Sequence, residues 1–144
     1  MKVIISGGGT GGHIYPAIAI AREVMRDYEN ADILFIGTEK GLENTLIPRE
    51  GFAFEKIKVR GFQRKFDFSN VIAIKELLSS FFHVYKIIKD YRPDIVIGTG
   101  GYVCGSTLLT ASLMGIPTLI HEQNAFPGIT NKILSRFVDK IALT

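Results

Sequence analysis

Residues 1–17 read MKVIISGGGTGGHIYPA, a short apolar run that passes through a glycine-rich turn and reaches a proline. Five of the six residues from Gly7 to Gly12 are glycine, so side chains are absent where phosphate groups can approach backbone amides. Proline is tolerated at the first position of a helix, and we therefore expect the next helix to begin at Pro16. A strand, a glycine turn and a helix in this order are typical of the first unit of a parallel α/β sheet.

The rest of the chain repeats this alternation, because short β-branched runs alternate with longer segments of helical periodicity. The predicted strands span residues 2–6, 32–36, 54–59, 94–98, 118–121 and 140–143. The predicted helices span residues 16–28, 42–49, 70–91, 105–114 and 128–137. Each strand is apolar enough to be covered on both faces. The sequence therefore predicts a doubly wound, Rossmann-like α/β domain with strand order 3-2-1-4-5-6.

The composition describes one ordinary globular domain, with 144 residues, 47% hydrophobic content and 22% charged residues. The net charge of +3 can favour phosphates or anionic lipid but is too small to predict nucleic-acid binding. A single cysteine, Cys104, excludes an internal disulfide, and the sequence lacks metal-ligand spacings, so neither a metal nor another cofactor is predicted. No apolar run reaches the roughly 18 residues of a membrane-spanning helix, and a secretory signal is missing, so any membrane contact is expected at the surface.

A second glycine cluster, Gly98–Tyr102, follows the fourth predicted strand. The first and fourth strands are neighbours in the predicted order, so both glycine loops are expected to flank one ligand at the carboxyl edge of the sheet. The fifth strand reaches the same edge with the polar run His121–Asn124. Two adjoining phosphate-binding turns and a polar rim indicate a diphosphate or a charged sugar ester. Each polar side chain alone is equally typical of a loop cap or a satisfied buried group.

His13 follows the first glycine turn directly and has two interpretations. As a general base it would take a proton from a ligand hydroxyl, and otherwise it would cap the helix or contact the diphosphate. The glycines also satisfy G-x-G-x-x-G through Gly7, Gly9 and Gly12, which leaves an NAD(P)- or FAD-binding module as an alternative. Glu39 comes later than a ribose-binding carboxylate usually does, which disfavours that alternative. A tight turn that needs glycine only for packing is a third interpretation.

The long helix is expected to have two distinct faces. One apolar stripe is expected to pack against the sheet and consists of Ile74, Leu77, Leu78, Phe81, Tyr85 and Ile88. Another face mixes apolar bulk with positive charge and includes Val71, Lys75, Phe82, Lys86 and Lys89. It follows a basic, aromatic segment that contains Phe62, Arg64, Lys65, Phe66 and Phe68. Such a surface can rest on anionic lipid or be an ordinary solvated helix face.

Three segments together resemble the signature loops of the MurG family of bacterial peptidoglycan N-acetylglucosaminyltransferases. They are GGGTGGHIYPA at 7–17, GTGGYVCGS at 98–106 and HEQNAFPGITN at 121–131. The resemblance implies one half of a GT-B enzyme that transfers N-acetylglucosamine from UDP-N-acetylglucosamine to lipid I, undecaprenyl-diphospho-muramoylpentapeptide, to give lipid II. It covers residues 1–144 as the amino-terminal, acceptor-binding domain, and we expect the carboxy-terminal, donor-binding domain to lie outside this chain. A stand-alone acceptor-binding subunit and a non-catalytic lipid-diphosphate binder remain alternatives.

The resemblance also assigns roles to residues. It places Thr10, Gly11 and Gly12 beside the donor and diphosphate, and Asn124 against the transferred sugar. The predicted substrate-binding residues are Thr10, Gly11, Gly12, Gly100, Gly101, Tyr102, Gln123 and Asn124. His13 and Glu122 are the candidate catalytic residues of an inverting, metal-independent reaction, with His13 preferred as the base. The predicted contacts with the anionic cytoplasmic face of the bacterial membrane are Phe66, Lys75, Phe82, Lys86 and Lys89.

Overall fold

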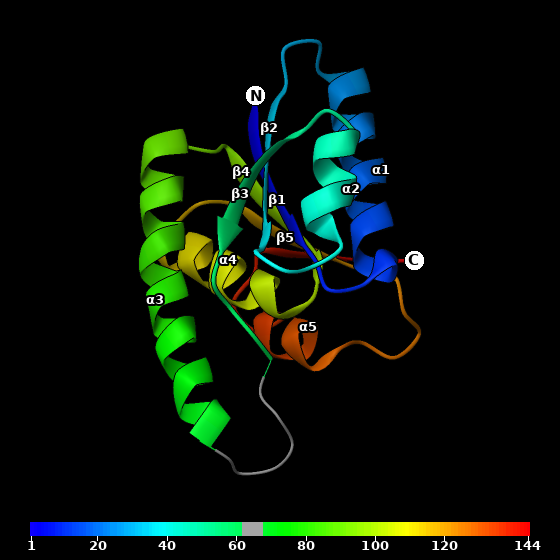
Figure 1. Ribbon diagram of the computed structural model, residues 1–144. Helices are drawn as coiled ribbons and strands as arrows, with labels where there is room; N and C mark the ends of the chain where they lie inside the picture. Colours follow the sequence, from blue (N-terminus) through cyan, green and yellow to red (C-terminus); the bar gives the residue numbers. More distant parts are fainter. Residues whose placement is uncertain (62–67) are drawn as a thin grey trace.

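In the computed structural model, which describes residues 1–61 and 68–144, six parallel strands form one sheet with helices on both faces (Figure 1). The strands are β1 (Lys2–Gly7), β2 (Asp32–Thr38), β3 (Ala53–Ile57), β4 (Ile95–Gly100), β5 (Thr118–Glu122) and β6 (Lys140–Leu143). The helices are α1 (Gly11–Asp27), α2 (Glu43–Arg49), α3 (Phe68–Tyr91), α4 (Tyr102–Leu113) and α5 (Ile129–Leu134). The strand order is β3-β2-β1-β4-β5-β6, which confirms the predicted topology.

Alternate side chains of the central strands enter two separate cores, one on each face of the sheet. Ile4 of β1 belongs to the core beneath α3, α4 and α5, whereas Val3 and Ile5 belong to the core beneath α1 and α2. Figure 1 shows α1 and α2 on one side of the sheet and α3 on the other. Each fully buried isoleucine contributes about 1.5–3 kcal/mol relative to an exposed one. Burial on both faces therefore fixes β1 and β4 in the centre of the sheet.

Two helices begin earlier than the sequence predicted. Helix α1 begins at Gly11, so Pro16 lies inside it, because Gly9 (φ +86°) already turns the chain and the Thr10 carbonyl accepts a hydrogen bond from Ile14 N (3.2 Å). Proline has no N–H, which leaves the Gly12 carbonyl without its usual helical donor. Helix α4 begins at Tyr102, so Gly105 lies inside it rather than at its start.

The predicted burial of the two edge strands was wrong, and the predicted buried stripe of the long helix was right only in part. In β3 and β6 most side chains are partly or fully exposed, because each edge strand has a neighbour on one side only. The buried stripe of α3 consists of Ala73, Ser80, Val84 and Ile88. Ile74, Leu78 and Tyr85, which were expected in the core, are 49%, 64% and 43% exposed. Ile88 is buried as predicted, and Leu77 and Phe81 are partly buried. Ala73 and Ser80 complete the contact because small residues let α3 approach its neighbours closely, so apolar bulk alone identified the face only in part.

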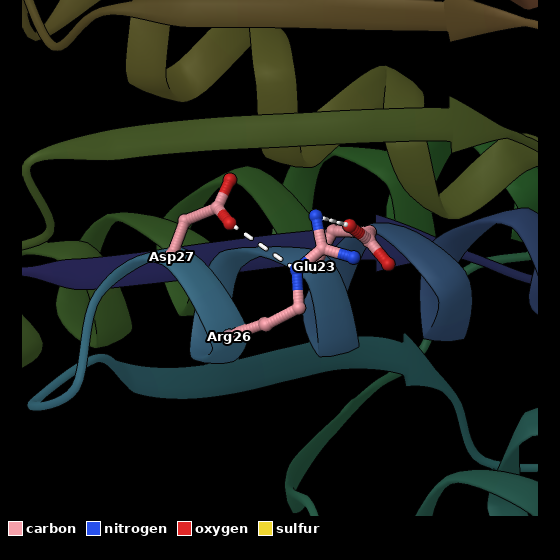
Figure 2. Close-up of polar contacts among 3 residues, drawn as sticks. All are labelled: Glu23, Arg26 and Asp27. Carbon is pink, nitrogen blue, oxygen red and sulfur yellow. Dashed lines mark hydrogen bonds and ion pairs between the residues drawn. The ribbon is translucent and has the colours of Figure 1, made fainter.

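The end of α1 that is remote from the glycine loop carries surface ion pairs. Figure 2 shows the Arg26 guanidinium group between the carboxylates of Glu23 and Asp27. All three side chains are more than half exposed, so these pairs contribute little to stability. Within the described ranges, no helix is long and apolar enough to cross a membrane.

Candidate functional site

The two glycine loops lie side by side at the carboxyl ends of β1 and β4, as the sequence predicted. Gly7 pairs with Gly100 in the sheet, and the Gly8 amide donates a hydrogen bond to the Gly100 carbonyl (3.3 Å). Gly101 has φ +91°, and a Cβ at this position would lie 2.5 Å from the Gly8 carbonyl oxygen. A side chain would therefore push the two loops apart, so glycine is required where they meet.

The amides of the first loop divide into two groups. The Gly8 amide is bonded to Gly100, and the Gly9 amide donates to the Glu43 carboxylate (3.0 Å). The Gly11 and Gly12 amides belong to the first turn of α1, where a helix offers them no backbone acceptor. These two amides, together with the positive end of the helix dipole, form the part of the loop that can bind an anion. They coincide with the predicted site at Thr10, Gly11 and Gly12.

His13 is held against the end of β4 by its backbone and its ring. The Thr99 hydroxyl donates to the His13 carbonyl (2.7 Å), and His13 Nδ1 lies 3.0 Å from the Thr99 carbonyl oxygen. The amide nitrogen of Gln123 lies 2.8 Å from the same Nδ1. In the described part of the chain, no protein hydrogen bond engages Nε2. The ring is therefore fixed through Nδ1, and Nε2 is the nitrogen that can meet a ligand.

The two contacts of Nδ1 correspond to two tautomers of His13. When Nδ1 carries the proton and donates to the Thr99 carbonyl, Nε2 has a free lone pair and can act as a base. When Nδ1 instead accepts from Gln123, the proton is on Nε2, which then donates to a phosphate or hydroxyl oxygen. The geometry thus accommodates both roles that the sequence left open for this residue.

Glu122 is buried at the end of β5, and its carboxylate is saturated with hydrogen bonds. One oxygen accepts from the backbone and side-chain amides of Asn124 (2.9 and 2.8 Å), and the other accepts from Gly128 N (3.2 Å) and Asn131 Nδ2 (2.9 Å). Burial by itself raises the pKa of Glu122, but the four donors outweigh it and hold the pKa below its ordinary value. This geometry favours a role in shaping the loop between β5 and α5. The predicted catalytic role of Glu122 stays a prediction.

A cavity of about 380 Å³ opens between the first turns of α1, α4 and α5. It is lined by His13, Gly100, Gly101, Tyr102, Gly128, Ile129, Thr130 and Asn131. Four predicted site residues therefore share one cavity, and Gln123 contacts His13 Nδ1, while Asn124 is exposed. The predicted catalytic and substrate-binding residues that do not line this cavity are Thr10, Gly11, Gly12, Glu122, Gln123 and Asn124. Tyr102 is 57% exposed, so its ring is available to a ligand.

Two residues that shape the site were not singled out from the sequence. Thr99 positions His13 through its hydroxyl and carbonyl groups, and Glu43 binds the first glycine loop. Thr99 lies inside the GTGG segment, which was a usable signal. Glu43 lies in a short helix with no distinctive pattern around it, so no signal in the sequence identified it.

Residues 3–143 match the sequence profile of the glycosyltransferase family 28 N-terminal domain. The chain belongs to glycosyltransferase family 28. This chain is 61% identical over 144 residues to an Acetivibrio thermocellus protein. That protein is named UDP-N-acetylglucosamine--N-acetylmuramyl-(pentapeptide) pyrophosphoryl-undecaprenol N-acetylglucosamine transferase. That match covers 100% of this chain and 39% of the relative. The Bacillus licheniformis protein of the same name is 52% identical over 143 residues, which are 99% of this chain and 39% of that protein.

Solved structures agree with this family 28 assignment. The crystal structure of Acinetobacter baumannii MurG matches with a TM-score of 0.86 at 34% identity, over 99% of this chain and 41% of that chain. A UDP-GlcNAc 2-epimerase from Methanocaldococcus jannaschii, at 19% identity and a TM-score of 0.67, shares the fold alone over 100% of this chain and 40% of that chain. The chain spans about two fifths of the length of the curated relatives it matches. Membership of family 28 supports the transferase interpretation of the glycine loops over the dinucleotide-binding one.

Proposed function

We propose that the chain is the acceptor-binding half of a GT-B enzyme that transfers N-acetylglucosamine from UDP-N-acetylglucosamine to the muramoyl 4-hydroxyl of lipid I. The observation that carries the proposal is the cavity beside two joined glycine loops, with His13 on its wall directly after the helix amides of Gly11 and Gly12 in the chain. The names of relatives that are 61% and 52% identical support the choice of donor and acceptor. A carboxy-terminal domain outside these 144 residues would hold most of the UDP-sugar.

The proposed reaction is a single inverting displacement. His13 Nε2 takes the proton of the acceptor hydroxyl, whose oxygen bonds to the anomeric carbon of the donor while the bond from that carbon to UDP breaks. The Thr99 carbonyl stabilises the protonated imidazole by accepting from Nδ1, which lies 3.0 Å away. The Gly11 and Gly12 amides stabilise diphosphate charge without a metal ion.

A transfer assay on the full-length protein, with UDP-N-acetylglucosamine and a soluble lipid I analogue, tests this function. We expect His13→Ala to lower kcat by about 10²- to 10⁴-fold if His13 is the base. A rise in KM with unchanged kcat would assign His13 to ligand contact alone. Saturable NAD(H) binding together with no response to the lipid I analogue would refute the transferase proposal.

We also propose that the exposed face of α3 rests on the anionic cytoplasmic surface of the membrane. Exposed residues recur on this face at intervals of four and three: Val71, Lys75, Leu78, Phe82, Tyr85 and Lys89. Phe82 is 71% exposed and Leu78 is 64% exposed, and Lys86 lies beside them. An apolar stripe flanked by lysines suits the boundary between lipid headgroups and acyl chains. Phe66, the fifth predicted contact, lies outside the described residues.

Vesicle flotation of the full-length protein tests the membrane proposal. Each lysine near an anionic surface contributes about 1 kcal/mol, so changing Lys75, Lys86 and Lys89 to Glu should weaken binding more than a hundredfold. The matched control changes Lys56, Lys132 and Lys140, which are exposed on other elements, to Glu. Equal losses in both variants would indicate a general charge effect, and undiminished binding of the α3 variant would refute the proposal.

A further inference from the structure

Glu43, the first residue of α2, is completely buried and accepts hydrogen bonds from two different loops. Its Oε1 accepts from the amide (2.9 Å) and hydroxyl (2.7 Å) of Thr38, and its Oε2 accepts from the amide of Gly9 (3.0 Å). Within the described residues, no lysine, arginine or histidine forms an ion pair with it. A buried carboxylate without a countercharge is tolerated only where donors surround it, so these bonds hold the loops firmly to α2.

Three glycines, one of them at the end of β2, lie around this carboxylate. A Cβ at Gly8, Gly37 or Gly41 would lie less than 3.0 Å from an atom of the Glu43 side chain. The hydroxyl of Thr38 in turn accepts a hydrogen bond from the Gly41 amide (3.0 Å). The absence of side chains at these glycines is therefore explained by the buried side chain of Glu43 and not by a ligand.

The bond to Gly9 acts at the pivot of the first loop. Gly9 has φ +86°, a Cβ built on it would meet no atom within 4 Å, and its amide donates to Glu43. The chain turns here from β1 into α1, and the free amides of Gly11 and Gly12 follow within three residues. Loss of the Gly9 bond would remove a fixed point from the turn that leads into those amides.

We infer that Glu43 is a positioning residue. It accepts a hydrogen bond from the Gly9 amide and thereby orients the Gly11 and Gly12 amides toward a bound diphosphate. The choice of diphosphate as the ligand rests on the proposed function, whereas the hydrogen bond from Gly9 to Glu43 does not. A simple charge effect predicts the opposite sign. Removing a negative charge near an anion site should strengthen anion binding, whereas removing a positioning bond should weaken it.

The test compares two near-isosteric variants of the full-length protein. In Glu43→Gln the amide oxygen can still accept from Thr38, but its NH₂ group faces the Gly9 N–H and cannot accept from it. Thr38→Val is the matched control, because it removes the hydroxyl bond to Glu43, together with the acceptor of the Gly41 amide, and leaves the bond between Glu43 and Gly9 in place. The readouts are hydrogen exchange at the Gly9 amide and calorimetric affinity for inorganic pyrophosphate and for UDP-N-acetylglucosamine.

We expect Glu43→Gln to speed hydrogen exchange at the Gly9 amide and to lower the affinity for both ligands roughly ten- to a hundredfold. This range corresponds to the free energy of one hydrogen bond to a charged group. Thr38→Val should leave both readouts close to wild type. Unchanged exchange at Gly9, tighter or unchanged ligand binding in Glu43→Gln, or equal losses in Thr38→Val would each overturn the inference. If the wild-type protein binds pyrophosphate but not UDP-N-acetylglucosamine, the proposed function fails, and Gly9 exchange and pyrophosphate affinity still decide the role of Glu43.

Discussion

Replacement of Glu122 by glutamine separates a scaffolding role from a catalytic one. The carboxylate is 3% exposed and receives four N–H groups, two on each oxygen. In Glu122→Gln one oxygen becomes an NH₂ group, so two of the four donors lose their acceptor. A hydrogen bond to a charged group contributes about 1.5–3 kcal/mol, and the expected loss of unfolding free energy is therefore about 3–6 kcal/mol. This is a large part of the roughly 5–15 kcal/mol by which a domain is stable.

Urea denaturation of the 144-residue chain measures the loss, and Glu39→Gln provides the matched control. Glu39 is exposed, so the same chemical change there should alter the unfolding free energy by less than about 0.5 kcal/mol. The effect also has a pH signature. The pKa of Glu122 is lower in the folded chain, so its contribution is complete above the unfolded pKa near 4.5 and is lost as the pH falls through the folded pKa. The wild type should therefore lose more stability below pH 4.5 than Glu122→Gln does.

A different outcome would refute this account of Glu122. If Glu122→Gln kept the wild-type stability and pH dependence while the full-length variant lost kcat alone, the carboxylate would be a catalytic base and not the scaffold of its loop. Loss of stability accompanied by loss of both kcat and substrate affinity is the expected result, because either Asn124 or the pair Gly128 and Asn131 would lose its acceptor.

Three further changes test other parts of the fold. Gly101→Ala forces an alanine to φ +91° with its Cβ 2.5 Å from the Gly8 carbonyl, and thermal unfolding should show a loss of at least about 1–3 kcal/mol. Burial raises the pKa of Cys104 to about 11 from an ordinary 9.0. The protonated thiol therefore adds about 2–3 kcal/mol to the free energy of unfolding below pH 9, and this stability is lost as the pH rises towards 11. Urea curves at pH 8 and 10.5 should reveal this loss in the wild type and not in Cys104→Ser. Arg26→Ala should change the free energy of unfolding, measured in urea, by less than about 1 kcal/mol, because its ion pairs are exposed.

The fold was predictable because its strongest signals are local. The apolar residues of β1 and β4 are continuous, which indicates strands buried on both faces, and the glycine loops mark where these strands end. The buried face of α3 was not predictable in the same way. Ala73 and Ser80 form part of its buried contact beside Val84 and Ile88, and neither of the two small residues contributes the apolar bulk on which a periodicity argument depends.

The candidate site was predictable in its position and less so in its internal contacts. Parallel strands carry their loops to one edge, so the joint location of His13 and Tyr102 followed from the strand order. The partners of His13 Nδ1 depend on side-chain directions at the ends of β4 and β5, which no spacing in the sequence specifies. Glu43 was missed for a related reason, since a carboxylate in a short helix is usually exposed.

The glycines of the first loop are dense because two separate requirements meet there. Gly8 is needed by the Glu43 carboxylate behind the loop, and Gly9 is needed for its positive φ. Gly12 has only the Thr10 hydroxyl within ordinary contact, 3.7 Å from where its Cβ would be, so space inside the protein does not demand glycine at that position. Under the proposed function, the bare backbone at Gly12 is the part of the motif that a diphosphate accounts for. The proposed phosphate-binding loop then includes glycines that serve the protein interior as well as a glycine that serves the ligand.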